Sequence, residues 1–377
     1  MQKEVDIIIP AYKAHDTIFK TLCSIATQTV ADKIMVTIVN DCCPEGDYQK
    51  VIRQFKGRLD IRELKLSKNG GPGAARRHGL ENATCPYIMF VDADDSLYGG
   101  VAVEQLLCTI SNPDNNADVV FSDFVQRGDT MSFAFHSRDI VWVFGKIYNR
   151  QFLIDNDITF TDLRANEDTC FNRKVYLVHK KMNKEIYFLD AVTYLWQNHK
   201  NSITNINQYQ YTYDQSICGW VDGLIEYFNW AHAHNISQNL INDDVMIFMA
   251  ELYTYYCGLG AIPYEVYENP DTVQILQEQN FEYVKKFYHL AWLPNKIDYH
   301  NQEFVKAYTE VVYNQIVTNM NPNIYMAQPN IVQFMDMLEH SPYNENDIIQ
   351  IRKKLPEDMK QNNIECGVCD KDYYKEK

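Results

Sequence analysis

Hydrophobic positions in the first half of the chain form short runs separated by amphipathic stretches. Four apolar runs predict buried strands, at residues 5–9, 35–39, 87–91 and 119–124, and residues 61–66 alternate as a half-buried strand does. The stretches between several of these runs carry apolar residues at helical spacing. Strands that alternate with helices predict an α/β domain, with a mostly parallel, Rossmann-like sheet covered by helices on both faces.

Two of the intervening helices have recognisable starts. Asp16 is expected to cap a helix whose apolar face includes Ile18 and Leu22. Pro72 follows a pair of glycines, and it suits the first turn of a helix that runs to about Asn82.

The pattern changes near residue 216, and it then indicates helices alone. Apolar residues recur at helical spacing through four stretches: 217–230, 245–256, 273–288 and 304–317. We therefore expect an α/β domain at residues 1–210, a mainly helical domain at 211–365 and a polar tail at 366–377. The helical domain is expected to bind an acceptor or to form a homo-oligomer.

Composition limits the class of protein. The 377 residues are 46% hydrophobic and 23% charged, which is typical of a globular protein. No run approaches the roughly 18–20 apolar residues of a membrane span, and no signal segment precedes the first strand. We expect a cytoplasmic protein, with peripheral attachment to a membrane left open. The net charge of −15 disfavours non-specific binding to nucleic acid.

Ten cysteines are scattered through the chain, several of them in apolar segments, as reduced core thiols are. Cys366 and Cys369 form one CxxC near the C-terminus, without a second pair at zinc-ribbon spacing. A metal or redox role for this pair and an ordinary polar tail both stay open.

The sequence Asp92-Ala93-Asp94-Asp95 ends the apolar run at 87–91. Carboxylates this close repel one another, and a divalent cation would relieve the repulsion. Asp92 and Asp94 offer the hard oxygens that Mg²⁺ or Mn²⁺ prefers, with other metal positions left for phosphate. The alternative is an acidic turn or a helix cap, in which Asp95 or Ser96 caps the next element.

Two further segments follow strands at the same edge of the predicted sheet. Asp41 ends the second strand, where it could accept hydrogen bonds from a nucleobase or bond a turn backbone. The loop from Asn69 to Arg76 is rich in small residues and precedes a helix, and both features suit phosphate binding. The Arg76 guanidinium group lies one turn into that helix, where it could bind a diphosphate or a base. Because ligands bind at the carboxyl ends of such strands, we expect Asp41, this loop and Asp92–Asp95 to line one crevice.

Two candidates lie further along the chain. Glu167 and Asp168 open a helix, either to complement its dipole or to supply a general base. His199 follows a strand-like run that ends at Trp196-Gln197, and it could bind a metal or phosphate or be an ordinary surface histidine.

Taken in order, these motifs resemble the family-2 glycosyltransferases with a GT-A fold. The segments Ile7–Tyr12 and Gly145-Lys146-Ile147-Tyr148-Asn149-Arg150 are also similar to that family's first strand and its "GKLYRR"-like segment. The resemblance covers residues 4 to about 205. The chain departs from the family at Asn40-Asp41-Cys42-Cys43, where two acids and Gly-Ser are usual, and at His78, where Asn is usual.

The resemblance implies a role for each motif, and a donor that is a nucleotide-sugar, with a UDP-sugar favoured. The residues it assigns to the donor are Pro10, Ala11, Tyr12, Asp41, Asn69, Gly70, Arg76, Asp92 and Ala93. Asp94 would be the principal ligand of Mn²⁺ or Mg²⁺, with Asp92 and His199 beside it. Asp168 would be the catalytic base of an inverting transfer, and Glu167 would orient it or bind the acceptor.

The acceptor is less defined. A glycan or a cell-surface polymer such as teichoic acid or capsule is expected from the family. Two alternatives stay open: transfer to a hydroxylated base in DNA, which the acidic charge disfavours, and a non-catalytic scaffold on the same fold.

Overall fold

The computed structural model describes residues 2–128, 132–163, 166–197, 217–256, 270–319 and 331–350. The chain divides into two compact units, Met1–Ser202 and Ile203–Lys377, here called the N-terminal unit and the C-terminal unit. His199 and the segment 366–377 with Cys366 and Cys369 lie outside the described residues. The functions expected of the two domains stay predictions.

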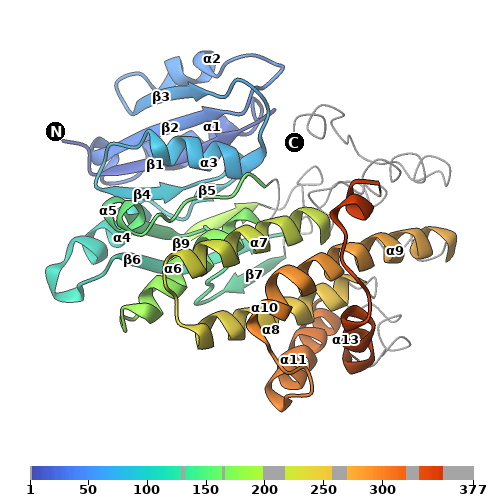
Figure 1. The fold of residues 1–377 in the computed structure, drawn as a ribbon. Coiled ribbons are helices and arrows are strands. Elements are labelled where there is room, and N and C mark those ends of the chain that lie inside the picture. The colour runs from blue at the N-terminus through green and yellow to red at the C-terminus, as the bar shows by residue number, and fades with distance from the viewer. Residues whose placement is uncertain are drawn as a thin grey trace. The chain divides into compact units, whose positions relative to one another are not determined.

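Four parallel strands form the first half of the sheet in the N-terminal unit, in the order β3-β2-β1-β4 (Figure 1). Their bounds are β1 Val5–Ala11, β2 Ile34–Asn40, β3 Asp60–Lys65 and β4 Tyr87–Phe90. All residues of β1 except Pro10 are buried, as expected for a strand covered by helices on both faces. The expected strands are therefore present, and their carboxyl ends meet at one edge.

The second half of the sheet is mixed. Its strands are β5 Ser96–Leu97, β6 Val119–Arg127, β7 Phe133–His136, β8 Lys146–Asn149 and β9 Tyr187–Gln197. Strand β8 lies antiparallel between β4 and β6, whereas β9 runs parallel to β6. The predicted α/β fold class is confirmed, with a sheet that is parallel through its first four strands and mixed beyond them.

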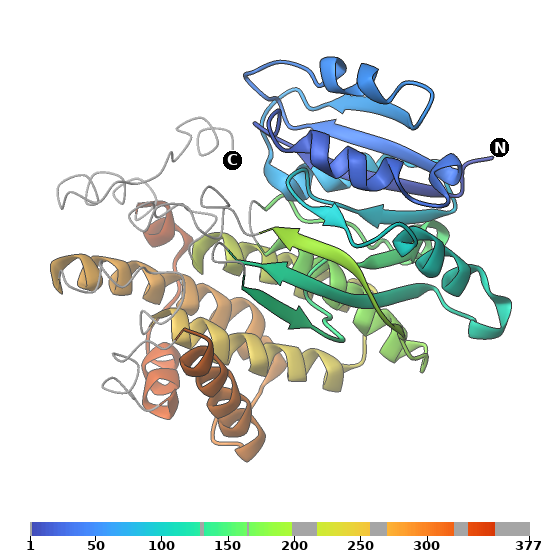
Figure 2. The same ribbon diagram turned by 180° about the vertical axis from the view of Figure 1, so that it is seen from behind.

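Helices cover both faces of this sheet. They are α1 Ile18–Ala26, α2 Gln49–Ile52, α3 Gly71–Glu81, α4 Ala102–Ser111, α5 Arg150–Asp155 and α6 Glu167–Lys181. Helix α3 packs on β1 and β2 on the face seen in Figure 1, and α1 lies on the face seen in Figure 2. The expected cap at Asp16 is wrong, because Thr17 is the N-cap residue and makes no side-chain cap bond.

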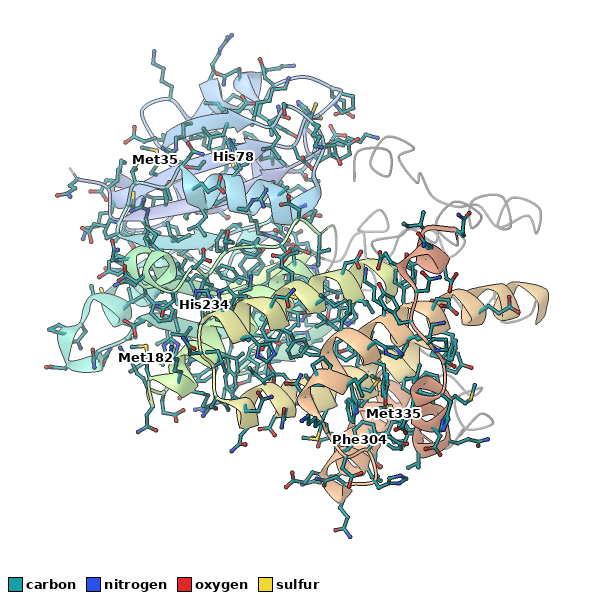
Figure 3. All side chains as sticks on the ribbon, viewed as in Figure 1. Met35, His78, Met182, His234, Phe304 and Met335 are labelled. Carbon is teal, nitrogen blue, oxygen red and sulfur yellow. The ribbon has the colours of Figure 1, made fainter. Side chains whose placement is uncertain are left out.

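The C-terminal unit is helical where it is described. Its helices are α7 Ile217–Ala233, α8 Gln238–Tyr256, α9 Pro270–Phe287, α10 Leu293–Asn295, α11 Gln302–Asn319 and α13 Ile331–Glu339, with a π-helical turn at Tyr288–Trp292. Figure 3 marks Phe304 and Met335, which are both fully buried. Trp220, Trp230 and Tyr253 are buried as well, so these aromatic residues belong to the core.

None of the helices in the described parts of the chain combines the length and the apolar character needed to cross a bilayer. The cytoplasmic location stays a prediction.

Candidate active site

The segments that follow β1, β2 and β4 meet at the carboxyl edge of the parallel strands. Pro10 and Ala11 end β1, and the Asp41 backbone N–H donates to the carbonyl of Ala11 over 3.0 Å. Tyr12, the next residue, has 43% of its surface exposed. The predicted donor residues of β1 and Asp41 therefore share this edge.

Asp41 holds the start of α3. Its Oδ1 accepts from the backbone N–H of Gly70 over 2.7 Å, and its Oδ2 accepts from that of Gly71 over 2.8 Å. The amide of Asn69 donates to the Asp41 carbonyl over 3.2 Å. Asp41 thus satisfies backbone N–H groups that the helix itself leaves without a partner. Recognition of a nucleobase by Asp41 stays a prediction.

The loop after β2 is organised by Asn40, at the point where the chain departs from the family pattern. Its Oδ1 accepts from the Cys43 N–H over 2.8 Å, and its amide donates to the Gly46 carbonyl and to Glu63, each over 2.9 Å. The Cys43 sulfur accepts from the Lys13 N–H over 3.3 Å. Asn40 and Cys43 therefore join the loops that follow β1 and β2.

Sequence reasoning missed a cluster beside this loop. The potential metal-ligand atoms of His15, Cys43 and Glu45 lie within 4.8 Å of one another. One ring nitrogen of His15 lies 3.0 Å from a Glu45 oxygen and the other lies 3.0 Å from the Asp47 carbonyl. The His15 ring also stacks on Tyr48. His15 lies 28 positions before Cys43 in no recognisable motif, and the contacts of these residues are those of a loop scaffold.

Small residues bring α3 against the segment that leads to α6. A Cβ atom on Gly73 would lie 2.2 Å from the Thr161 carbonyl oxygen and 2.8 Å from that of Leu163. The Gly73 N–H donates to this Leu163 carbonyl over 3.2 Å. Gly73 is thus required for a close backbone approach. This approach carries Arg76, one turn further along α3, towards the start of α6.

Arg76 joins the two acidic parts of the site. One terminal nitrogen lies 2.6 Å from Asp92 Oδ1, and the other bonds Glu167 Oε1. Burial alone would lower the pKa of Arg76, but the carboxylates of Asp92, Glu167 and Asp168 outweigh burial and raise it. Arg76 is therefore a permanent buried cation between the loop after β4 and helix α6.

The loop after β4 is fixed by Asp95, and the alternative in which Asp95 or the next residue caps a helix is wrong. Asp95 is buried, and strand β5 follows it. Its Oδ2 accepts from the Tyr194 hydroxyl and its Oδ1 from the Gln197 N–H, both over 2.7 Å. The Tyr194 hydroxyl also accepts from the Asp92 N–H over 3.1 Å. Sequence reasoning missed Tyr194, because a buried tyrosine on a strand is expected in any core.

The same loop collects negative charge that a divalent cation would offset. Burial raises the pKa of Asp95, and the charges of Asp94 and Asp92 raise it further. Arg76 binds Oδ1 of Asp92, and this carboxylate has a second oxygen. Closely spaced carboxylates beside a phosphate site are what Mg²⁺ and Mn²⁺ bind, so Asp92 and Asp94 fit such an ion. His199, the third predicted ligand, lies outside the described residues.

Glu167 and Asp168 form the first turn of α6 and are both buried. Burial first and the charge of Glu167 second raise the pKa of Asp168, against the effect of Arg76, to about 8. Burial raises the pKa of Glu167 as well, against the effect of Arg76. One bond to the Asp168 carboxyl comes from the Thr169 N–H over 3.0 Å. A carboxyl with a pKa near the working pH is suited to act as a general base.

The chain is similar in sequence to known glycosyltransferases. Residues 6–172 match the model of glycosyl transferase family 2. The uncharacterized glycosyltransferase EpsJ of Bacillus subtilis is 26% identical over 249 residues, which are 60% of this chain and 70% of that protein. The poly(ribitol-phosphate) beta-N-acetylglucosaminyltransferase TarS of Staphylococcus aureus is 28% identical over 185 residues, 45% of this chain. The chain spans only about a third of TarS, 32% of its length.

Solved structures show the same fold. The crystal structure of S. aureus TarS residues 1–349 in complex with UDP-GlcNAc superimposes with a TM-score of 0.57 at 19% sequence identity. The superposition covers 83% of this chain and 92% of that one. The predicted GT-A fold is thereby confirmed.

Proposed function

We propose that this chain moves a sugar from a nucleotide-diphosphate donor to an acceptor hydroxyl, with inversion, as the match of its residues 6–172 to glycosyl transferase family 2 supports. One observation carries the proposal: Arg76 contacts both Asp92, in the acidic loop after β4, and Glu167, which adjoins Asp168. One buried cation thus joins the loop expected to face the donor diphosphate to the start of α6, which carries the expected base Asp168.

The donor would bind along the carboxyl edge of β1, β2 and β4. Pro10, Ala11 and Tyr12 would line the nucleotide together with Asp41, which also fixes the start of α3. Because the structurally similar TarS was crystallised with UDP-GlcNAc, a UDP-sugar is the favoured donor.

Residues of this chain would stabilise the negative charge of the diphosphate leaving group. Asp94 and Asp92, with His199, would hold Mn²⁺ or Mg²⁺, which when bound offsets negative charge on the leaving diphosphate. Arg76 keeps Asp92 and Glu167 together, and its Nε is buried without a hydrogen-bond partner in the described part of the chain.

Asp168 would remove the proton from the acceptor hydroxyl. The acceptor oxygen then attacks the anomeric carbon on the face opposite the diphosphate, and the carbon–oxygen bond to the diphosphate breaks. A single displacement of this kind inverts the anomeric configuration, and it needs no covalent sugar–enzyme intermediate. Glu167, held by Arg76, would orient Asp168 or the acceptor.

A glycan or cell-surface polymer is the proposed acceptor class, and it is supported by the named activity of TarS. Hydroxylated DNA is disfavoured by the net charge of −15, since binding to DNA depends on cations that neutralise phosphates.

A thermal-stability screen tests the proposal. The full chain is heated with UDP, GDP, CDP or ADP, each with Mn²⁺ and with EDTA. A ligand that binds only the native state stabilises it, by about 2.7 kcal/mol at a hundred times its Kd. We expect a metal-dependent shift with UDP, followed by UDP release when the matching UDP-sugar is supplied, with water as the acceptor of the sugar. If no nucleotide gave a shift and no nucleotide-sugar were consumed, the transferase assignment would be overturned.

A further inference from the structure

The two tryptophans of residues 1–202 lie together in the fold although 54 positions of sequence separate them. Trp142 lies in the loop before β8, and Trp196 lies near the end of β9. Their ring centroids are 5.2 Å apart, and both side chains are partly exposed. Part of the aromatic surface of this pair is therefore accessible to solvent.

A column of stacked rings connects this pair to the acidic loop. Trp142 and Phe144 stack with centroids 5.6 Å apart and planes 5° from parallel. Phe144 in turn stacks on Tyr194 at 4.7 Å and 11°, and the Tyr194 hydroxyl donates to Asp95. Trp196 lies 5.6 Å from Phe144. The position of both indoles is therefore tied to the loop that would face the donor diphosphate.

The loop that carries Trp142 is also anchored to the helix that carries the base. Asn172 lies one turn after Asp168 on α6, and its amide donates to the carbonyls of Val141 (2.7 Å) and Trp142 (3.0 Å). The Tyr148 hydroxyl donates to the Asn172 carbonyl oxygen over 2.8 Å, which fixes the direction of that amide. Trp142 is thereby held at a set place relative to Asp168.

A buried ammonium completes the anchor. Lys146 has no exposed surface, and its Nζ donates to the Trp142 carbonyl and to Asp139 Oδ1, the latter over 3.3 Å. The same Asp139 oxygen accepts from the Trp142 N–H over 2.8 Å. Burying an ammonium is costly unless it is bonded, so this cluster is built to hold the loop in one conformation.

From this geometry we infer that Trp142 and Trp196 form the acceptor subsite of the enzyme and bind the apolar face of a neutral pyranose ring by stacking. This inference rests on the proposed transferase function. The C–H face of a pyranose packs against an indole as other apolar surfaces do, and stacking orients the ring. With the platform tied both to the acidic loop and to α6, a stacked sugar would present its hydroxyl groups between donor and base.

The surrounding charges select against a polyanionic acceptor. The Lys146 cation is buried against the Asp139 carboxyl instead of facing solvent, and the His136 ring, 6.5 Å from Trp196, stacks on Phe124. Phosphate recognition needs accessible cations or N–H donors. The subsite therefore suits the neutral terminal sugar of a glycan better than a polyol-phosphate chain.

Saturation-transfer NMR and intrinsic fluorescence on the full chain, with UDP and Mn²⁺ present, test the inference. The probes are the methyl pyranosides of glucose, galactose, mannose and N-acetylglucosamine, with ribitol 5-phosphate as the polyol phosphate. We expect at least one pyranoside to bind through its ring C–H protons, and more tightly than ribitol 5-phosphate. Trp142→Ala and Trp196→Ala should each weaken that binding about tenfold, the loss expected for about 1.4 kcal/mol of stacking.

Two further variants act as controls. Trp142→Phe keeps an aromatic face and should bind within about threefold of the wild type, since stacking persists. Phe135→Ala removes an exposed ring on β7 and should change nothing. The UDP-induced thermal shift should be intact in all four variants, which shows that they are folded with a working donor site.

The outcomes separate this inference from the proposed function. A wild-type chain without a nucleotide shift or donor turnover would contradict the transferase function itself. A normal UDP shift would instead overturn the acceptor subsite alone if no pyranoside bound, if ribitol 5-phosphate bound better, or if both alanine variants bound pyranosides unchanged.

Discussion

Two buried aspartates of the N-terminal unit stand at helix starts, and their surroundings differ. Asp41 lies on the proposed donor side, and both of its carboxyl oxygens accept backbone N–H groups at the start of α3. Asp168 lies in the first turn of α6, where burial beside Glu167 raises its pKa to about 8. A carboxyl bonded at both oxygens positions a helix, whereas a buried carboxyl beside a second acid is prepared to take up a proton.

Arg76 contacts both Asp92, in the loop after β4, and Glu167, beside Asp168. Its removal should therefore cause the largest loss of stability. Arg76→Met would leave Asp92 and Glu167 without their shared cation, and we expect a loss of about 3–5 kcal/mol in the free energy of unfolding. Urea denaturation measures this loss. Arg77→Met is the matched control, because Arg77 is partly exposed and its pairs with Asp162 and Glu81 should contribute less than about 1 kcal/mol. Equal losses in the two variants would show that Arg76 is not the structural link.

Asp41→Asn tests the donor side. An amide has one acceptor oxygen, so its NH₂ group would face an N–H group of Gly70 or Gly71, and we expect destabilisation of about 1–3 kcal/mol. Asp60→Asn is the control, since the Asp60 carboxyl is exposed and forms a surface ion pair with Lys3. If Asp41→Asn left the unfolding midpoint unchanged but abolished the UDP-induced shift, nucleobase recognition would be its main role.

The raised pKa of Asp168 predicts how the reaction depends on pH. Because its pKa is about 8, most of the Asp168 carboxyl is protonated at pH 7, and the basic form accumulates as the pH rises. The kcat/KM for transfer should therefore increase about tenfold per pH unit below the pKa and level off above it. Initial rates from pH 5.5 to 9.5 at constant ionic strength measure this profile. A flat profile, or one that falls between pH 6 and 8, would exclude Asp168 as the base.

The donor half of the fold could be predicted because its signals are local. The runs at 35–39 and 87–91 are followed directly by Asn40-Asp41 and by Asp92 at the sheet edge, and the strand at 5–9 is closed by Pro10. Parallel strands joined by helices have few alternative arrangements, so the convergence of Asp41, the loop before Arg76 and Asp92 follows from chain order.

The second half depends on contacts between distant residues. The bond from Tyr194 to Asp95 spans 99 positions, and the bond from Arg76 to Glu167 spans 91. Apolar runs do not reveal that β8 inserts antiparallel between β4 and β6. The pairing of Trp142 with Trp196 likewise follows from the register of β6, β8 and β9 instead of any motif.

Asp168 is proposed to act as the base without contributing to the binding of the nucleotide donor. Asp168→Asn keeps the size of the side chain but cannot take up the proton, so donor turnover should fall by about 10²–10⁴-fold. The Kd for UDP with Mn²⁺ should stay within about threefold of the wild type. A turnover within about tenfold of the wild type, a difference of only ~1.4 kcal/mol in the activation barrier, would contradict the assignment.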